Sequence, residues 1–150
     1  MSQSAQQTAW RLFIENAVRL QTELDRRLKA ADMCLSDYQV LLLLHESPDR
    51  SLRMNELGRR MVFSASRLTY QIDTLCRRGW VRRENATEDR RGSYAVLTDE
   101  GNTAFEAAAA GHSADIDELF YSAVADDDDA TVLANIMRRL ADNLNNSENP

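Results

Sequence analysis

The sequence predicts a mainly helical α+β fold, in which a compact middle is flanked by long helices from both ends of the chain. Apolar residues recur at three- and four-residue spacing over most of the chain, and they alternate near residues 80–84 and 93–97. Five glycines and two prolines in 150 residues leave few points at which helices must break. The predicted order is four helices, two strands and two helices.

The first predicted helix covers residues 10–28, because large apolar residues recur along it at helical spacing. A break follows, and Ser36 with Gln39 has the spacing of a capping box that starts a second helix. This second helix is expected to run to about residue 46. Its apolar run at 40–44 predicts burial on several sides.

Two short helices joined by a tight turn follow, which is the pattern of a helix-turn-helix. Apolar residues at 54, 57 and 61 mark the first of them. Ser64 is placed to cap the second, which is expected to run to about residue 78 with positions 68, 72 and 75 turned inward. Gly79 is well placed to end it.

The two predicted strands enclose the loop 85–92, which is too long for a tight turn and is expected to protrude. Thr98 is a plausible cap for the next helix, which is expected to continue to about residue 125. Four aspartates at 126–129 form a junction, and Asp129 is expected to cap the final helix. The tail at 147–150 is expected to be disordered.

The terminal helices carry large apolar residues that a monomer of this size has little core to cover. Pairing them with a second copy in a two-fold homodimer is the economical solution, and packing the two ends within one chain is the alternative. We therefore expect an N-terminal dimerisation helix (1–35), a compact middle domain (36–98) and C-terminal dimerisation helices (99–146). The residues predicted at the dimer interface are Trp10, Phe13, Ile14, Ile136, Leu140 and Leu144.

The net charge of −6 is distributed unevenly along the chain. Residues 50–91 hold eleven arginines and five acidic residues, a local net charge of +6, and the remainder carries −12. This asymmetry indicates a basic working surface between acidic flanks, whereas a merely solvated basic face is the alternative.

The helix capped by Ser64 carries side chains suited to reading a DNA groove. Arginine and glutamine recognise guanine and adenine, hydroxyls contact bases or phosphates, and the helix N-terminus favours a phosphate. Arg59, Arg60, Arg77 and Arg78 are expected to frame this helix and contact phosphates. The residues of this helix predicted to contact DNA are Ser64, Ser66, Arg67, Thr69, Tyr70, Gln71 and Arg77.

Two adjacent arginines lie at the tip of the protruding loop. Asp89 can accept a hydrogen bond from the backbone amide two residues on, and Gly92 tolerates a sharp exit from the turn. A guanidinium held at such a tip suits the narrow minor groove of DNA. The predicted DNA contacts in this loop are therefore Asp89, Arg90 and Arg91, with a solvated neighbour as the alternative reading of Arg90.

The run "DRRGSYAVLTDEG" resembles the wing signature of the MarR family of winged-helix transcription regulators, Asp-x-Arg, five residues, then Leu-Thr. It falls here on Asp89, Arg91, Leu97 and Thr98, and residues 52–83 resemble the helix-turn-helix of that family. The resemblance implies a winged helix-turn-helix whose N- and C-terminal helices form a dimerisation domain. It also implies a homodimeric regulator, expected to be a repressor, on a pseudo-palindromic promoter site in double-stranded DNA. The helix from Ser64 would then enter the major groove and Arg91 the minor groove, with Asp89 orienting the wing.

The resemblance further implies release by a small ligand, which in this family binds between the winged domain and the dimerisation helices. A small aromatic or phenolic effector is expected, and the matching residues are Phe13, Cys34, Tyr38 and His112. His112 lies on an apolar helical stripe, so it also fits a packed, hydrogen-bonded histidine. Oxidation of Cys34 is the alternative switch, although Asp32 and Asp37 nearby oppose the lowered thiol pKa that it needs.

Other classes of protein find little support in the sequence. No apolar run approaches the ~20 residues of a membrane span, and no export signal is recognisable, so a cytoplasmic, nucleoid-associated protein is expected. We find no cofactor motif, metal-ligand spacing or catalytic constellation, and we expect neither a metal site nor an enzyme. The second functional hypothesis is a winged-helix interaction module, such as an antirepressor, whose basic face binds an acidic protein.

Overall fold

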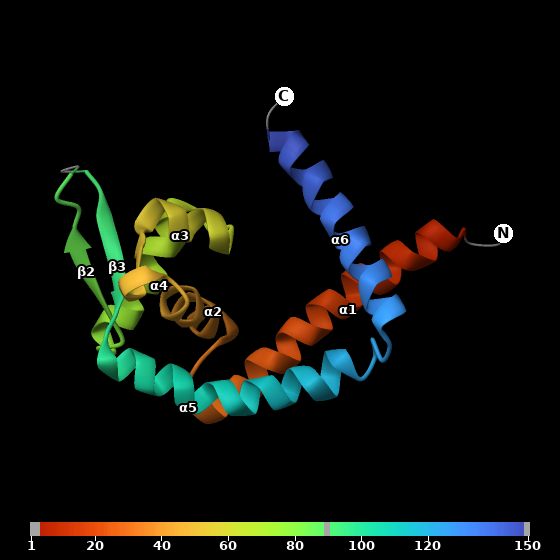
Figure 1. The fold of residues 1–150 in the computed structure, drawn as a ribbon, viewed down its shortest axis with the longest axis horizontal. Coiled ribbons are helices and arrows are strands. Elements are labelled where there is room, and N and C mark those ends of the chain that lie inside the picture. Colours follow the sequence, from red (N-terminus) through yellow and green to blue (C-terminus); the bar gives the residue numbers. More distant parts are fainter. Residues whose placement is uncertain (1–3, 89–90, 149–150) are drawn as a thin grey trace. The chain divides into compact units, whose positions relative to one another are not determined.

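The computed structural model describes residues 4–88 and 91–148 (Figure 1). Within these ranges, the helices are α1 (Ala5–Leu28), α2 (Leu35–His45), α3 (Met54–Met61), α4 (Ala65–Arg77), α5 (Asp99–Ile116) and α6 (Asp127–Glu148), and the strands are β1 (Ser51–Arg53), β2 (Val81–Asn85) and β3 (Ser93–Leu97). The chain divides into two compact units, residues 1–112 and 113–150. The predicted class, mainly helical with a winged helix-turn-helix, is confirmed.

The three strands form an antiparallel sheet in the order β1-β3-β2. Ala95 of β3 lies opposite Leu52 on one side and opposite Arg83 on the other. The sequence predicted β2 and β3, with β2 beginning one residue early at Trp80, but it missed β1. The strand β1 has only three residues, none of them fully buried, so it has no alternating pattern to reveal it.

The core of the first unit lies between α2, α3, α4 and the sheet. The side chains of Leu41, Leu44, Leu57, Ile72 and Leu75 are fully buried there. Burial of α2 on several sides is confirmed, and the inward face predicted for α4 is confirmed at Leu68, Ile72 and Leu75. Gly79 ends α4 with a positive φ of 76°, as predicted.

The predicted start of α2 is wrong by two residues. Cys34 caps this helix, its Sγ accepting a hydrogen bond from the Asp37 amide at 3.4 Å while Asp37 Oδ2 accepts from the Cys34 amide at 3.1 Å. Ser36 therefore lies inside the first turn and does not form the expected capping box with Gln39. An ionised Asp37 accepts the N-terminal amide proton more strongly than the neutral Gln39 would, because a charged acceptor makes the stronger hydrogen bond.

Two other caps agree with the prediction. The Ser64 hydroxyl accepts from the Arg67 amide at 3.2 Å, which starts α4. The Thr98 hydroxyl accepts from the Gly101 amide at 3.0 Å and donates to the Gly79 carbonyl at 2.7 Å. Thr98 thus caps α5 and joins its start to the end of α4.

The terminal helices differ from the predictions at their ends. The first helix begins at Ala5, where a Ser4–Gln7 capping box starts it. The helix after Thr98 does not continue regularly to residue 125, because a π-helical segment, Asp117–Tyr121, follows Ile116. Asp126, not Asp129, caps α6, since its Oδ1 accepts from the Asp129 amide at 2.8 Å. Residues 147 and 148 belong to α6 rather than to the expected disordered tail, and residues 149–150 lie outside the described range.

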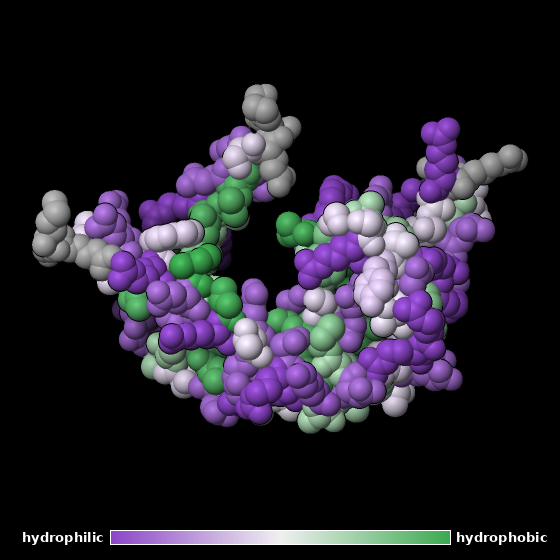
Figure 2. All heavy atoms as spheres, turned by 180° about the vertical axis from the view of Figure 1, so that it is seen from behind, coloured by the Kyte–Doolittle hydropathy of each residue, from purple (hydrophilic) through white to green (hydrophobic). Residues whose placement is uncertain are grey.

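Large apolar side chains are exposed on α1 and, separately, on α6. Figure 2 shows apolar surface along α6, leading toward the grey residues of the C-terminus. The most exposed member on α1 is Trp10, at 63%. The residues predicted at the dimer interface are all at the surface to some degree: Trp10, Phe13, Ile14, Ile136 and Leu144 are exposed and Leu140 is half-buried.

Candidate nucleic-acid interface

The helix α4 is fixed by its apolar face and presents its opposite face to solvent. Thr69 and Tyr70 lie on the outer face, and Tyr70 is 70% exposed. Ser66 is also exposed, with its hydroxyl 3.4 Å from that of Ser64. These predicted contact residues therefore share one exposed surface that begins at the N-terminus of the helix.

Two arginines extend this surface at opposite ends of α4. The Arg67 guanidinium lies over the Phe63 ring, with its central carbon 3.8 Å from the ring centroid. Arg77 is exposed at the other end and donates to the Thr74 hydroxyl at 3.2 Å. Stacking on an aromatic ring restricts Arg67 while leaving its edge able to donate hydrogen bonds.

Arg78 does not lie beside Arg77 on the exposed face. Its guanidinium stacks over Trp80, 3.5 Å from the ring centroid, and pairs with Asp32 at 2.9 Å. The sequence-based expectation that Arg78 frames the helix with Arg59 and Arg60 is therefore corrected: Arg78 joins the end of α4 to the segment before α2. Arg59 and Arg60 are exposed on α3, where Arg59 pairs with Glu56.

Gln71 lies at the flank of α4 rather than on its outer face. It is half-buried, and its side-chain amide donates a hydrogen bond to Oδ1 of Asp37 on α2. Asp37 itself is only 7% exposed. A residue predicted to read DNA is thus tethered to a buried carboxylate on a neighbouring helix.

An ion pair fastens the wing, here β2, β3 and the loop between them, to α4. Arg83 of β2 pairs with Asp73 of α4 at 2.6 Å, and it donates to the Thr69 carbonyl at 3.4 Å. The two partners are 38% and 40% exposed, so solvent screens the pair and its main effect is geometric. The orientation of the wing relative to α4 is thereby restrained.

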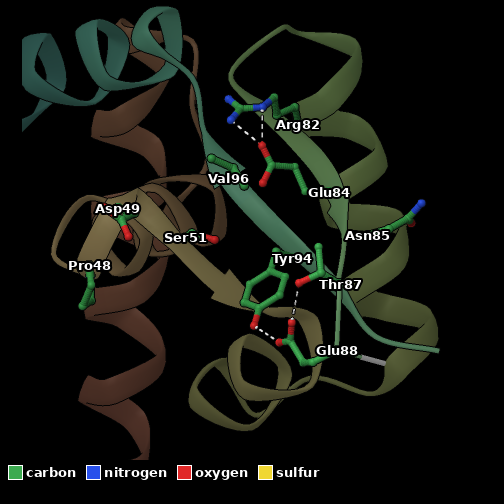
Figure 3. Close-up of a pocket in the computed structure, with 10 residues that line it drawn as sticks. All are labelled: Pro48, Asp49, Ser51, Arg82, Glu84, Asn85, Thr87, Glu88, Tyr94 and Val96. Carbon is green, nitrogen blue, oxygen red and sulfur yellow. Dashed lines mark hydrogen bonds and ion pairs between the residues drawn. The ribbon is translucent and has the colours of Figure 1, made fainter. Parts of the chain in front are cut away.

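A second polar cluster lies at the start of the wing loop, in the pocket of Figure 3. The Tyr94 hydroxyl and the Arg53 guanidinium both donate to Oε1 of Glu88 at 2.7 Å, and the Thr87 hydroxyl donates to its other oxygen at 3.0 Å. These hydrogen bonds, that from Tyr94 first, lower the pKa of Glu88 to about 2. Glu88 therefore joins the start of the wing loop to Arg53, the residue that immediately precedes α3.

The predicted loop contacts are only partly within the described residues. Arg91 is exposed in a turn, and the Ala86 amide donates to the Gly92 carbonyl at 3.0 Å across the base of the loop. Asp89 and Arg90 lie outside the described residues.

The residues predicted for an effector site are brought together in part. The Tyr38 ring lies 4.1 Å from that of His112 and 5.2 Å from that of Phe105, measured between ring centroids. Cys34 precedes Tyr38 by one helical turn, and both Tyr38 and His112 are buried. Phe13 instead lies near Trp10, with 6.5 Å between the ring centroids. The packing expected for a histidine on the apolar stripe is thus observed, within an aromatic cluster.

The surroundings of Cys34 oppose a reactive thiolate. Burial raises the pKa of the Cys34 thiol, and the negative charges of Asp37 and Asp25 raise it further, against the lowering effect of the Asp37 backbone amide. Burial also raises the pKa of Cys76. Only the thiolate is an efficient nucleophile, so neither environment favours oxidation.

Sequence reasoning missed three residues that hold the site in place, namely Asp37, Arg83 and Glu88. Asp37 has a local signal, because it follows Cys34 at capping-box spacing. Arg83 and Glu88 have none, since their partners Asp73 and Arg53 are distant in sequence. In the part of the chain that the structure describes, no helix is long and apolar enough to cross a membrane. No group of three or more metal-binding side chains occurs there either.

Comparisons with known proteins agree with this geometry. A MarR family profile matches residues 31–92. AbsC, a MarR family transcriptional regulator from Streptomyces coelicolor, is 32% identical with a TM-score of 0.92, over 97% of this chain and 98% of that chain. Sco3205, a MarR family regulator from the same organism in complex with DNA, is 37% identical with a TM-score of 0.90, over 96% of this chain and 91% of that chain.

Curated relatives match over a shorter range. The HTH-type transcriptional repressor YetL of Bacillus subtilis is 31% identical over 106 residues, which cover 69% of this chain and 64% of YetL. A second regulator of that organism, YkoM, is 31% identical over 98 residues, or 65% of this chain and 62% of YkoM. The chain thus spans less than two thirds of the length of these two relatives.

Proposed function

We infer the function from the premise that this chain belongs to the MarR family of winged helix-turn-helix transcription regulators. We propose that it is a homodimeric regulator that binds a pseudo-palindromic promoter site in double-stranded DNA and represses transcription. It acts in the cytoplasm, on the nucleoid, and a small aromatic or phenolic molecule releases it.

The observation that carries this proposal is the outer face of α4. Ser66, Thr69 and Tyr70 are exposed there, with Arg67 near the start of the helix and Arg77 at its end. Hydroxyl, phenol and guanidinium groups are those that contact base edges and phosphates in a major groove. The basic stretch around this helix, +6 over residues 50–91, favours a polyanion despite the net charge of −6.

The wing supplies the second contact. In this proposal α4 is the recognition helix and Arg91 enters the adjacent minor groove, with Asp89 orienting the wing. The Arg83–Asp73 pair and the Glu88 cluster support this role, because the first restrains the wing relative to α4 and the second ties the wing loop to Arg53, the residue before α3. A wing held in this way loses less conformational entropy when Arg91 enters the groove.

The apolar side chains exposed on α1 and on α6 support the homodimer. Exposed apolar residues such as Trp10 on α1 and Val132 on α6 cost free energy in water, and a second copy can cover them. A two-fold dimer also presents two recognition helices, as a pseudo-palindromic site requires. Sedimentation of the purified protein at micromolar concentration should give the mass of two chains.

The aromatic cluster of Tyr38, Phe105 and His112 supports an aromatic effector, because aromatic rings stack favourably on one another. The raised pKa of the Cys34 thiol favours such a ligand over oxidation as the releasing signal. Addition of phenolic compounds to the protein–DNA complex tests this part, with release of DNA as the expected result.

Selection from a randomised duplex library tests the central part. The purified protein should enrich one pseudo-palindromic sequence, and unrelated duplex should compete poorly for it. If the protein is instead an interaction module for an acidic protein, no sequence will be enriched, and non-specific DNA will compete with its protein partner.

A further inference from the structure

We propose that Asp37 is a positioning residue that fixes the side-chain amide of Gln71 and thereby sets the base preference of α4. This inference rests on the proposed function, since it concerns how that recognition helix discriminates between sequences. Asp37 lies on α2 and would not itself contact DNA.

Asp37 is placed to hold Gln71 firmly. Asp37 is 7% exposed, and its Oδ1 accepts the hydrogen bond from Gln71 Nε2. The other oxygen, Oδ2, accepts from the Cys34 amide at 3.1 Å and lies 3.7 Å from Arg78 Nη1. The carboxylate therefore has partners on both oxygens, and rotation to another position would break several interactions at once.

The partners of Asp37 are themselves fixed. Arg78 stacks on Trp80 and also pairs with Asp32, at 2.9 Å. The start of α2 is held by the Cys34 capping box, and the positive end of its dipole favours the Asp37 charge. Functional groups are most specific when packing and hydrogen bonds restrain them in this way.

The chemistry of a carboxylate determines which end of the Gln71 amide faces it. An ionised carboxylate only accepts hydrogen bonds, so the NH2 group of the amide must turn toward Asp37 and the carbonyl oxygen must turn away. This leaves Gln71 one N–H and the carbonyl oxygen for other partners. A donor and an acceptor on one amide are the pair that recognises the Hoogsteen edge of adenine.

The place of Gln71 on α4 makes this orientation relevant to DNA. Gln71 is half-buried and follows Tyr70, which is 70% exposed on the outer face. The amide thus lies at the edge of the surface that would face the groove. Without the hydrogen bond to Asp37, the Gln71 amide could present either its oxygen or its nitrogen to the groove. The preference of α4 for one base over another would then weaken.

The test compares Asp37→Asn with Asp32→Asn on the sequence selected by the wild-type protein. An asparagine at 37 can donate to the Gln71 oxygen as well as accept from its nitrogen, so the amide can turn around. We expect D37N to lose most of a ~5- to 150-fold preference at one base pair of each half-site, the range of a bidentate contact. D32N makes the same chemical change in the other carboxylate that pairs with Arg78, yet touches no part of Gln71, and should keep the preference.

Gln71→Met provides an independent measurement with a side chain of similar length and no hydrogen bonds. It should lose preference at the same base pair as D37N, while Gln39→Met, on the exposed face of α2, should lose none. In the double variant D37N/Q71M, the preference should be no weaker than in Q71M alone, because Asp37 acts through Gln71.

Two results would overturn the inference. One is an unchanged base preference in folded D37N, including the case in which it binds all sequences more weakly by the same factor. The other is an unchanged base preference in Q71M. This result would overturn the inference even if D37N does not fold. If the wild-type protein enriches no sequence at all, the proposed function fails and this inference falls with it.

Discussion

Replacing Val62 with glycine is predicted to stabilise the protein. Val62 lies in the turn between α3 and α4 with φ 56° and ψ 42°, which is the left-handed region of backbone conformation. This region is unfavourable for a β-branched residue and natural for glycine. The valine side chain is 84% exposed, so its removal loses little buried apolar surface.

The magnitude follows from two opposing terms. The left-handed conformation costs an L-residue about 1–2 kcal/mol, and glycine loses about 0.4–1 kcal/mol through the greater entropy of its unfolded chain. The difference predicts that V62G raises the free energy of unfolding by about 1 kcal/mol. The matched control V62A shortens the side chain but keeps the Cβ, and it should stay within about 0.5 kcal/mol of wild type.

Urea unfolding followed by circular dichroism measures this difference, with the free energies extrapolated to water. All variants must be compared at one protein concentration, because dimerisation stabilises the folded state by mass action. If V62G is less stable than wild type, the reasoning is refuted, since the valine would then contribute more through contacts than its backbone conformation costs.

Three further changes test other parts of the structure. Gly101→Ala should lower the free energy of unfolding by about 3 kcal/mol, because its Cβ would lie 2.1 Å from the Trp80 carbonyl oxygen; a normal melting temperature would contradict this contact. Glu88 has a folded pKa of about 2, below its ordinary value of 4.5, so its contribution to stability is present above about pH 4.5 and is lost as the pH falls through about 2. Acid unfolding of E88Q should therefore be less steep than that of wild type between these values, and identical curves would contradict the Glu88 cluster. Arg91→Ala should weaken binding to the selected duplex by about 1–3 kcal/mol in a gel-shift titration if the contact is base-directed, and unchanged affinity would exclude the wing contact.

The helix α4 shows what the sequence can predict. Its cap at Ser64, its buried positions and its end at Gly79 agree with the structure, because caps and amphipathic periodicity depend on residues within one or two turns. The same local signals explain why the exposed face with Tyr70 was predicted.

Features that depend on distant partners were missed or misplaced. The strand β1 exists because Ser51–Arg53 pairs with β3, over forty residues later in the chain, and nothing local marks it. Gln71 and Arg78 are polar, so periodicity assigns them to the surface. In the structure, Gln71 donates a hydrogen bond to Asp37 and Arg78 forms an ion pair with Asp32. Neither aspartate lies on α4.

The cap of α2 shows a different limit. Serine is a commoner cap than cysteine, so residue preferences predict a capping box at Ser36–Gln39 and overlook Cys34–Asp37. The outcome depends on Asp25 of α1, whose Oδ1 accepts from the Leu35 amide at 2.7 Å and so satisfies another amide of the first turn. Residue preferences alone do not include such a contact.

The salt dependence of binding to the selected duplex tests the central claim most directly. If each subunit of the dimer neutralises ~4 phosphates, the logarithm of the binding constant should fall with the logarithm of salt concentration at a slope of about −7. A fluorescence anisotropy titration from low to physiological salt measures this slope. A slope near zero, or equal affinity for the selected and scrambled duplexes at every salt concentration, would contradict sequence-specific DNA binding by this protein.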